Sequence, residues 1–353
     1  GNTLVDMYAK CGAFVKAQEV FSELPLQDMV SWNILIAGYV QHGHIEEAVK
    51  FFHRMQLRAL CPDIVTFLSI LRACGTIGTS QKGQLIHAQI HMIRDENLEK
   101  GISVGNALLD MYAKCGAFAN AQELFEKLPV PTTISWNALI SGYAQQDCGD
   151  FSLQIFRQMQ IEGIEADKVT FMSVLKACST ISTVDQVRFI HSQIIQMDLG
   201  SSEQIGSILI DVYAKCKSVQ AAEEIFNKLT CKDSVLWNTI ISAHVNEGSV
   251  EQAFKFFLRM QHECVALQQS TFVLMLKLCC CRGLLHDGQL LFNYIYDSHC
   301  QVNYFIGTAL VDLYMKCGAV EDAATIFNKL NRRGVVTWSA LIAGYAWHGY
   351  ATE

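Results

Sequence analysis

The apolar side chains of this chain recur with the spacing of amphipathic helices. Ala17, Val20, Phe21 and Leu24 lie at positions i, i+3, i+4 and i+7, which places them on one face of a helix. Matching stripes follow over residues 121–128, 222–229 and 323–330. No run alternates between apolar and polar residues for long enough to predict a strand. The pattern therefore predicts an all-α protein.

Glycines stand where the first helix of each predicted pair should end. Gly is favoured there because it adopts the left-handed backbone that follows a helix without steric cost. The glycines at this place are Gly12, Gly43, Gly116, Gly248 and Gly318. A pair of helices cannot bury both of its faces by itself, so neighbouring pairs must stack. We therefore expect an α-solenoid, a right-handed superhelix of two-helix repeats.

The sequence also matches itself at a long period. The tryptophans Trp32, Trp136, Trp237 and Trp338 are spaced by 104, 101 and 101 residues. Residues 7–12 return at 111–116, 212–217 and 313–318. A Thr-Phe pair recurs at 66–67, 170–171 and 271–272. Self-similarity of this kind indicates a repeat array rather than a set of unrelated domains.

Each period divides into three two-helix repeats. The complete repeats are 29–63, 64–101, 102–132, 133–167, 168–202, 203–233, 234–268, 269–303 and 304–334. Partial repeats flank them at 1–28 and 335–353, so we expect the chain to be a fragment of a longer protein. Repeat 64–101 is longer than its counterparts, which predicts a loop extension around residues 95–97.

Composition constrains the compartment and the partner. The 353 residues carry a net charge of −7, which argues against a nucleic-acid partner. The 14 cysteines include no Cys-x-x-Cys pair, and half recur in phase with the repeats, so we expect small packing residues in a reducing compartment. The recurring positions are Cys11, Cys74, Cys115, Cys178, Cys216, Cys279 and Cys317. No stretch of about 18 uninterrupted apolar residues occurs, so no membrane partner is expected.

Several phrases of the sequence are close to one known consensus. They are Val-Ser-Trp-Asn at 30–33, Ile-His-Ala at 86–88 and Leu-Asp-Met-Tyr-Ala-Lys-Cys-Gly at 109–116. With the triplet spacing, they resemble the pentatricopeptide repeat (PPR) family, in its plant-type subclass of alternating P, L and S repeats. The resemblance covers the whole chain. Tetratricopeptide repeats share the two-helix plan, but their Trp, Leu-Gly and Tyr pattern does not stand here.

The resemblance implies a class for every repeat. The P repeats are 29–63, 133–167 and 234–268, and the L repeats are 64–101, 168–202 and 269–303. The S repeats are 102–132, 203–233 and 304–334. A partial S repeat stands at 1–28 and a partial P repeat at 335–353.

The resemblance further implies binding of single-stranded RNA, about one base per repeat, read by the fifth and last residues. The pairs at these places are Asn2/Asp28, Asn33/Asp63, Asn106/Thr132, Asn137/Asp167, Ser207/Asp233, Asn238/Gln268 and Thr308/Gly334. The second residues implied to sandwich the bases are Val30, Ile134, Val235 and Val336. L repeats carry Leu68, Met172 and Val273 at the fifth place, and these side chains cannot hydrogen-bond a base.

These side chains also have structural interpretations. An Asn in the first turn can cap a helix, and an Asp that ends a repeat can cap the next helix. Four lysines end the first helices of S repeats, where they can meet phosphates or complement the helix dipole. They are Lys10, Lys114, Lys215 and Lys316. The net charge of −7 conflicts with RNA binding unless basic groups gather on one face.

Nothing in the sequence indicates catalytic chemistry. His44-Ile45-Glu46 has the His-x-Glu spacing of cytidine deaminases, but no Cys-x-x-Cys accompanies it. His87 and His91 have the i, i+4 spacing of helical metal ligands, but Ile195 stands in the place of His91 one period later. We therefore expect no cofactor, no metal and no enzymatic activity.

The P, L and S layout implies an organellar RNA-processing factor, in the mitochondrion or the chloroplast. The role it favours is site recognition for C-to-U RNA editing, with editing-complex proteins as partners through a missing C-terminal region. Two alternatives stay open. One is organellar transcript stabilisation or splicing, and the other is a protein-binding helical-repeat scaffold.

Overall fold

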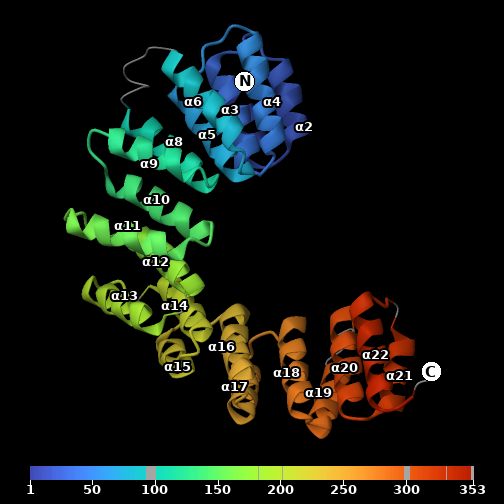
Figure 1. The fold of residues 1–353 in the computed structure, drawn as a ribbon. Coiled ribbons are helices and arrows are strands. Elements are labelled where there is room, and N and C mark those ends of the chain that lie inside the picture. Colours follow the sequence, from blue (N-terminus) through green and yellow to red (C-terminus); the bar gives the residue numbers. More distant parts are fainter. Residues whose placement is uncertain (93–100, 182, 201, 298–302, 331, 351–353) are drawn as a thin grey trace. The chain divides into compact units, whose positions relative to one another are not determined.

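The computed structural model describes residues 1–92, 101–181, 183–200, 202–297, 303–330 and 332–350. Within these ranges every regular element is an α-helix (Figure 1). The helices form two compact units, Gly1–Ile181 and Ser182–Glu353. The loop extension predicted around residues 95–97 lies outside the described residues.

The first compact unit is a stack of helix pairs. Its helices are α1 (Asn2–Lys10), α2 (Phe14–Ser22), α3 (Met29–Gln41), α4 (Ile45–Leu57), α5 (Ile64–Ile77), α6 (Ser80–Met92), α8 (Ile102–Lys114), α9 (Phe118–Lys127), α10 (Thr133–Gln145), α11 (Gly149–Ile161) and α12 (Lys168–Ile181). From α1 to α10, each first helix packs on its own second helix and also on the next first helix. The helices α1, α3, α5, α8, α10 and α12 therefore form a continuous row.

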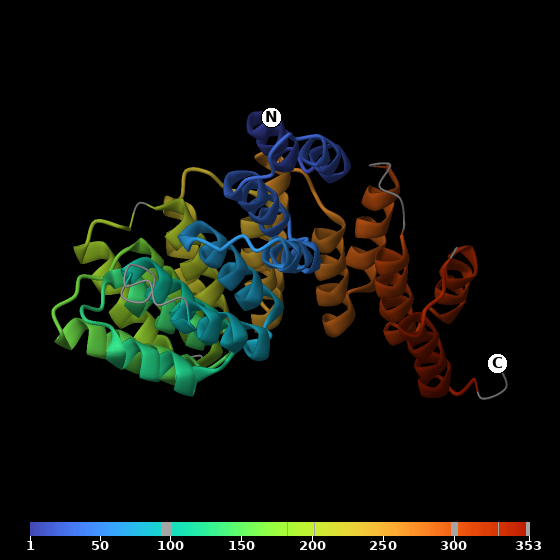
Figure 2. The same cartoon turned by 90° about the horizontal axis from the view of Figure 1, so that it is seen from above.

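The second compact unit repeats this plan. Its helices are α13 (Val184–Gln196), α14 (Glu203–Lys215), α15 (Val219–Lys228), α16 (Ser234–Glu247), α17 (Val250–His262), α18 (Gln269–Arg282), α19 (Leu285–Asp297), α20 (Tyr304–Lys316), α21 (Val320–Lys329) and α22 (Val335–Trp347). The row of first helices runs here from α14 through α16, α18 and α20 to α22. Figure 2 shows the helices of each unit stacked side by side from a second direction.

The start and the end of the first helices follow from local chemistry. Asp28, Asp63 and Asp233 cap α3, α5 and α16, because each carboxylate accepts a backbone N–H of the first turn. The five glycines predicted to end first helices have φ between 70° and 82°. Lys217 holds the same place after α14 with a φ of 57°, which is unfavourable for a residue with a side chain.

The core forms where two of the sequence series meet. The buried Trp32 of α3 packs edge-on against Phe21 of α2, with ring centroids 4.9 Å apart. The same contact recurs as Phe125–Trp136, Phe226–Trp237 and Phe327–Trp338. Edge-to-face pairs at this distance stabilise a core beyond the area that they bury. The tryptophan series and the Ala-Phe stripes are thus two sides of one packing arrangement between consecutive repeats.

The cysteines that recur in phase mostly contribute to this packing. Cys74, Cys178, Cys216 and Cys279 are buried, while Cys115 and Cys317 are half-buried and Cys11 is exposed. The thiols of Cys74 and Cys279 lie among apolar groups, and burial raises the pKa of Cys74 to about 11 and that of Cys279 to about 12. These two side chains therefore act as small apolar groups at neutral pH.

The structure confirms the predicted fold class, an all-α solenoid of two-helix repeats. Helices of nine to fourteen residues account for all regular structure in the described ranges. Across those ranges, no helix has both the length and the apolar character that a bilayer crossing requires.

Candidate nucleic-acid interface

The predicted base-reading residues lie along the row of first helices. The fifth residue of a repeat sits one turn inside its first helix, as Asn137 does in α10. The last residue directly precedes the next first helix, as Asp167 does before α12. Because α10 packs on α12, the two side chains meet at the junction between consecutive repeats.

Three of the predicted pairs are joined directly by hydrogen bonds. Asn33 Nδ2 donates to both carboxylate oxygens of Asp63, at 3.0 and 3.1 Å. Asn137 Nδ2 donates to Asp167 Oδ1 at 3.0 Å, and Asn2 Nδ2 donates to Asp28 Oδ1 at 3.3 Å. The pairing of fifth and last residues, which the sequence could only imply, is a physical contact in these repeats.

A third side chain completes the arrangement. The hydroxyl of Thr66, the third residue of the next repeat, donates to Asn33 Oδ1 at 2.6 Å. Equivalent contacts of 2.7 Å are Ser135 to Asn106, Thr170 to Asn137 and Thr271 to Asn238. Sequence reasoning assigned no role to these hydroxyls. The signal for three of them was the Thr-Phe pair that recurs at 66–67, 170–171 and 271–272.

Two predicted pairs are arranged differently. Asn106 meets Ser135 instead of Thr132, and Thr132 shares hydrogen bonds with Ser135 in a capping box. Ser207 Oγ donates to the backbone oxygen of Glu203 in its own helix at 2.7 Å. Asp233 accepts the backbone N–H of Leu236 at 2.9 Å and so serves as a helix cap.

The last two pairs carry other partners. Asn238 Nδ2 donates to Ser270 Oγ at 3.0 Å, while Gln268 Nε2 donates to Ser234 Oγ at 2.7 Å. Thr308 donates to the backbone oxygen of Tyr304 and lies 2.7 Å from the hydroxyl of Thr337. Gly334, the last residue of that repeat, has no side chain to offer.

The aspartates combine two roles. Burial raises the pKa of Asp63, but the N–H and hydroxyl of Thr66 and the amide of Asn33 outweigh it, so the net shift is downward. The same balance lowers the pKa of Asp167. The structure shows that the capping interpretation is correct for these carboxylates. It is wrong for Asn33, which is buried inside α3 and caps nothing.

The predicted second residues are exposed beside these clusters. The exposed fractions are 56% for Val30, 65% for Ile134, 63% for Val235 and 64% for Val336. Each side chain belongs to the first turn of a first helix. Branched apolar groups that stand this far out of the core offer a surface on which a planar ring can stack.

One repeat junction forms an open hollow of about 460 Å³. Asn238, Gln268, Val235 and Lys215 all line it, so four side chains that the sequence singled out share one concave surface. The hollow lies along α14, α16 and the start of α18. A fifth residue, a last residue, a second residue and a helix-end lysine thus face the same space.

The four helix-end lysines are paired within their own helices. The Nζ-to-carboxylate distances are 2.7 Å for Lys10–Asp6, 2.6 Å for Lys114–Asp110, 2.7 Å for Lys215–Asp211 and 2.9 Å for Lys316–Asp312. Each pair is at least partly exposed and contributes little to stability. The row of first helices therefore carries less net positive charge than the lysines alone suggest, which agrees with the net charge of −7.

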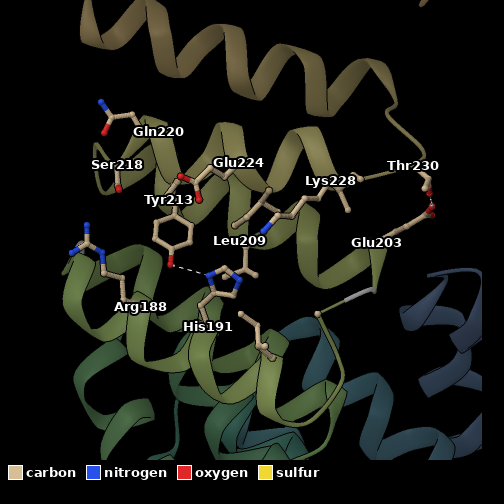
Figure 3. Close-up of a pocket in the computed structure, with 15 residues that line it drawn as sticks. Arg188, His191, Glu203, Leu209, Tyr213, Ser218, Gln220, Glu224, Lys228 and Thr230 are labelled. Atoms are coloured by element: carbon tan, nitrogen blue, oxygen red, sulfur yellow. Dashed lines mark hydrogen bonds between the residues drawn. The ribbon is translucent and has the colours of Figure 1, made fainter.

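A larger pocket lies elsewhere in the second compact unit. Figure 3 shows this pocket of about 730 Å³ between α13, α14 and α15, where His191 Nδ1 lies 3.1 Å from the hydroxyl of Tyr213. Burial lowers the pKa of His191, so the imidazole is neutral at pH 7. The same contact, at 2.9 Å, joins His87 and Tyr112 in the first unit. The recurrence favours a packing role for these histidines between the repeats.

No metal site is present among the described residues. No three His, Cys, Asp or Glu side chains there come close enough together to hold an ion. His87 Nε2 and His91 Nε2 lie 3.1 Å apart, and His44 packs edge-on against Phe14 at the start of α4. The histidines with metal-like spacing thus contact each other or aromatic rings.

These observations define a class of protein, a helical-repeat solenoid that presents one small set of side chains per repeat. The chain belongs to the pentatricopeptide repeat family. A family model described as "PPR repeat family" matches residues 27–76, 131–180 and 232–281. A second, described as "PPR repeat", matches residues 2–27, 106–129, 207–233, 308–335 and 336–353.

Curated relatives come from Arabidopsis thaliana. A pentatricopeptide repeat-containing protein named as chloroplastic is 33% identical over 347 residues, which cover 98% of this chain and 42% of the relative. Another, named as mitochondrial, is 32% identical over 348 residues, with 98% of this chain and 50% of the relative covered. The chain thus spans half or less of the length of these two proteins.

Solved structures show the same fold. The pentatricopeptide repeat protein PPR10, in complex with an 18-nt psaJ RNA element, matches with a TM-score of 0.83. The match covers 98% of this chain and 52% of PPR10 at 16% sequence identity. The crystal structure of PPR10 from maize matches with a TM-score of 0.51 over 99% of this chain and 61% of that one, at 16% sequence identity.

Proposed function

We propose that this chain binds single-stranded RNA in a sequence-specific manner, one base per repeat. The observation that supports it most is the Asn–Asp contact that recurs at Asn33/Asp63 and Asn137/Asp167 beside an exposed Val30 or Ile134. A base needs a hydrogen-bonding group at its edge and an apolar surface against its ring. Each of these junctions offers both within one turn of a first helix.

The base preferences follow from the side chains at each junction. Asn with Asp favours U, and Ser or Thr with Asp favours G, by resemblance to the family. From the N-terminal repeat onwards, we expect U, U, any base, pyrimidine, U, any base, G, pyrimidine, any base and a purine. The L repeats are assigned any base because Leu68, Met172 and Val273 present no donor or acceptor.

We place this activity in an organellar RNA-processing factor that acts by binding and not by catalysis. The names of the chloroplast and mitochondrial relatives support an organellar location. The P, L and S assignment supports site recognition for C-to-U editing, with editing-complex proteins as partners. Transcript stabilisation and splicing use the same recognition step and differ in what is recruited afterwards.

Fluorescence anisotropy with labelled ten-nucleotide RNAs tests the proposal. The predicted single strand should bind at least tenfold more tightly than the same sequence in a duplex, because a duplex buries the base edges. Replacing the fifth base, the U opposite Asn137 and Asp167, should weaken binding. Equal affinity for single strand and duplex would point to binding through charge alone. No binding to either would favour the protein-binding scaffold.

A further inference from the structure

Four buried hydroxyls contact the predicted base-reading amides from the next repeat. They belong to Thr66, Ser135, Thr170 and Thr271, each the third residue of its repeat and each fully buried. Their oxygens lie 2.6 to 2.7 Å from the Oδ1 atoms of the preceding Asn residues. The hydroxyls of Thr66 and Thr170 also lie 2.8 and 2.9 Å from the Oδ1 atoms of Asp63 and Asp167, so each of these two hydroxyl hydrogens lies between the amide oxygen and the carboxylate of its cluster. Loss of such a buried hydroxyl leaves the amide oxygen without this donor, which is unfavourable.

The carboxylate and the hydroxyl together set which way round the amide lies. In the cluster of Asn137, Asp167 and Thr170, the carboxylate takes an Nδ2 hydrogen and the hydroxyl donates to Oδ1. A reversed amide would place its oxygen against the carboxylate and its NH₂ group against a hydroxyl hydrogen. At Asn106 no carboxylate ends the repeat, and Ser135 alone makes this contact with Oδ1.

The held amide keeps a defined set of free hydrogen-bonding groups. An Asn side chain has two N–H donors and two acceptor lone pairs. In Asn137, one donor is engaged by Asp167 and one lone pair by Thr170. One donor and one acceptor remain, in an order that the two partners fix. A pyrimidine edge presents an acceptor and a donor side by side, so the order decides which base the amide fits.

The sequence pattern follows the same logic across the chain. After the L repeats, whose fifth residues are apolar, the third residues of the next repeats are the buried aliphatic side chains Val104, Ile205 and Ile306. Ser207 is followed by Leu236 at this place and donates to its own helix instead. A hydroxyl thus stands at the third place after every predicted base-reading Asn, and an aliphatic side chain follows each aliphatic fifth residue. Ser31, which follows Asn2, is the exception in its contact, because its hydroxyl donates to the backbone oxygen of Asp28.

We propose that Thr66, Ser135, Thr170 and Thr271 are specificity-determining positioning residues, each of which orients the base-reading Asn of the preceding repeat. The proposal rests on the proposed RNA-binding function. It assigns base recognition to three side chains: the fifth and last residues of one repeat and the third residue of the next. The hydroxyl of that third residue does not need to touch RNA.

Thr170 offers the clearest test. Thr170→Val keeps the shape and removes the hydroxyl, Thr170→Ser keeps the hydroxyl, and Ser152→Ala removes another fully buried hydroxyl, which donates to Ile140 O in the same compact unit. Binding is measured with RNAs that carry each of the four bases at the fifth position. We expect Thr170→Val to reduce the preference for U by about tenfold, while Thr170→Ser and Ser152→Ala retain it.

The outcomes separate the two proposals. Loss of affinity for all four bases equally in Thr170→Val, or a retained preference, overturns the positioning role. A wild-type chain without a base preference at this position contradicts the proposed function itself. A measurement without RNA applies in either case: the side-chain NH₂ signals of Asn137 should exchange with solvent faster in Thr170→Val than in Thr170→Ser. Equal exchange would also overturn the inference.

Discussion

Asn33 and Asp63 lie 30 positions apart in the chain, and two hydrogen bonds of 3.0 and 3.1 Å join them. The same carboxylate accepts the backbone N–H of Thr66 at 2.8 Å and so begins the next first helix. One aspartate therefore serves both the predicted recognition of a base and the start of a helix. Substitutions here must separate an effect on binding from an effect on stability.

Base choice should change at a single position when one fifth residue changes. Asn137→Thr beside Asp167 should shift the fifth base from U towards G, because a shorter hydroxyl leaves room for a purine. A contact of this kind discriminates by about 1–3 kcal/mol. Binding to RNAs varied at that base measures it, with Met172→Thr in the next L repeat as the control that should change little. Equal loss for all four bases would assign Asn137 a general contact.

The capping role of Asp167 should appear in stability and in its pH dependence. Asp167→Ala should lower the free energy of unfolding by about 1 kcal/mol, and Asp167→Asn by less, because Asn also caps helices. The folded-state pKa of Asp167 is lowered, so its ionised form stabilises the fold above the unfolded value of about 3.9, and this contribution is lost as pH falls. Urea unfolding at pH 7 and below pH 4 measures this. Asp167→Asn should show the weaker pH dependence, and an equal dependence would contradict the assignment.

Lys217 occupies a backbone conformation that the equivalent S repeat gives to Gly116. Lys217→Gly should raise the free energy of unfolding by about 0.5–1 kcal/mol, because the left-handed backbone is strained for Lys. The reciprocal change, Gly116→Lys, should lower it. Thermal unfolding of both variants checks the pair. A destabilised Lys217→Gly would show that the Lys side chain contributes more than the backbone strain removes.

Exposed cysteines should react with a thiol reagent faster than buried cysteines. Iodoacetamide at pH 8 should modify the exposed Cys11, Cys61, Cys231, Cys264 and Cys281 in the folded protein. It should spare Cys74, Cys279 and Cys280, because burial raises their pKa values to about 11, 12 and 12. Peptide mass spectrometry after a timed reaction reads this out. The spared cysteines should react once urea unfolds the chain, and rapid native alkylation of Cys279 would contradict the packing.

The fold was predictable because its causes are local and repeated. The apolar stripe around Phe21 forms the packing face of a second helix, Trp32 packs on it from the next first helix, and Gly43 ends that first helix. The aspartate contacts were implied through a family resemblance only. The roles of Thr66 and Thr170 could not be derived, because a hydroxyl three residues after a cap has the same sequence signature as an ordinary capping box. The contact with an Asn thirty-three positions earlier exists only after repeats stack.

The third side chain of each cluster also sets where such an array can be cut and rejoined. A transplanted segment 133–167 would carry Asn137 and Asp167 but would borrow its hydroxyl from whatever sequence the host places next. A segment that ends after Thr170 would carry all three groups with it. In the design of chimeric arrays, the exchanged segment should therefore not end where the helix pair ends. Its C-terminal boundary should lie one turn inside the first helix of the following repeat.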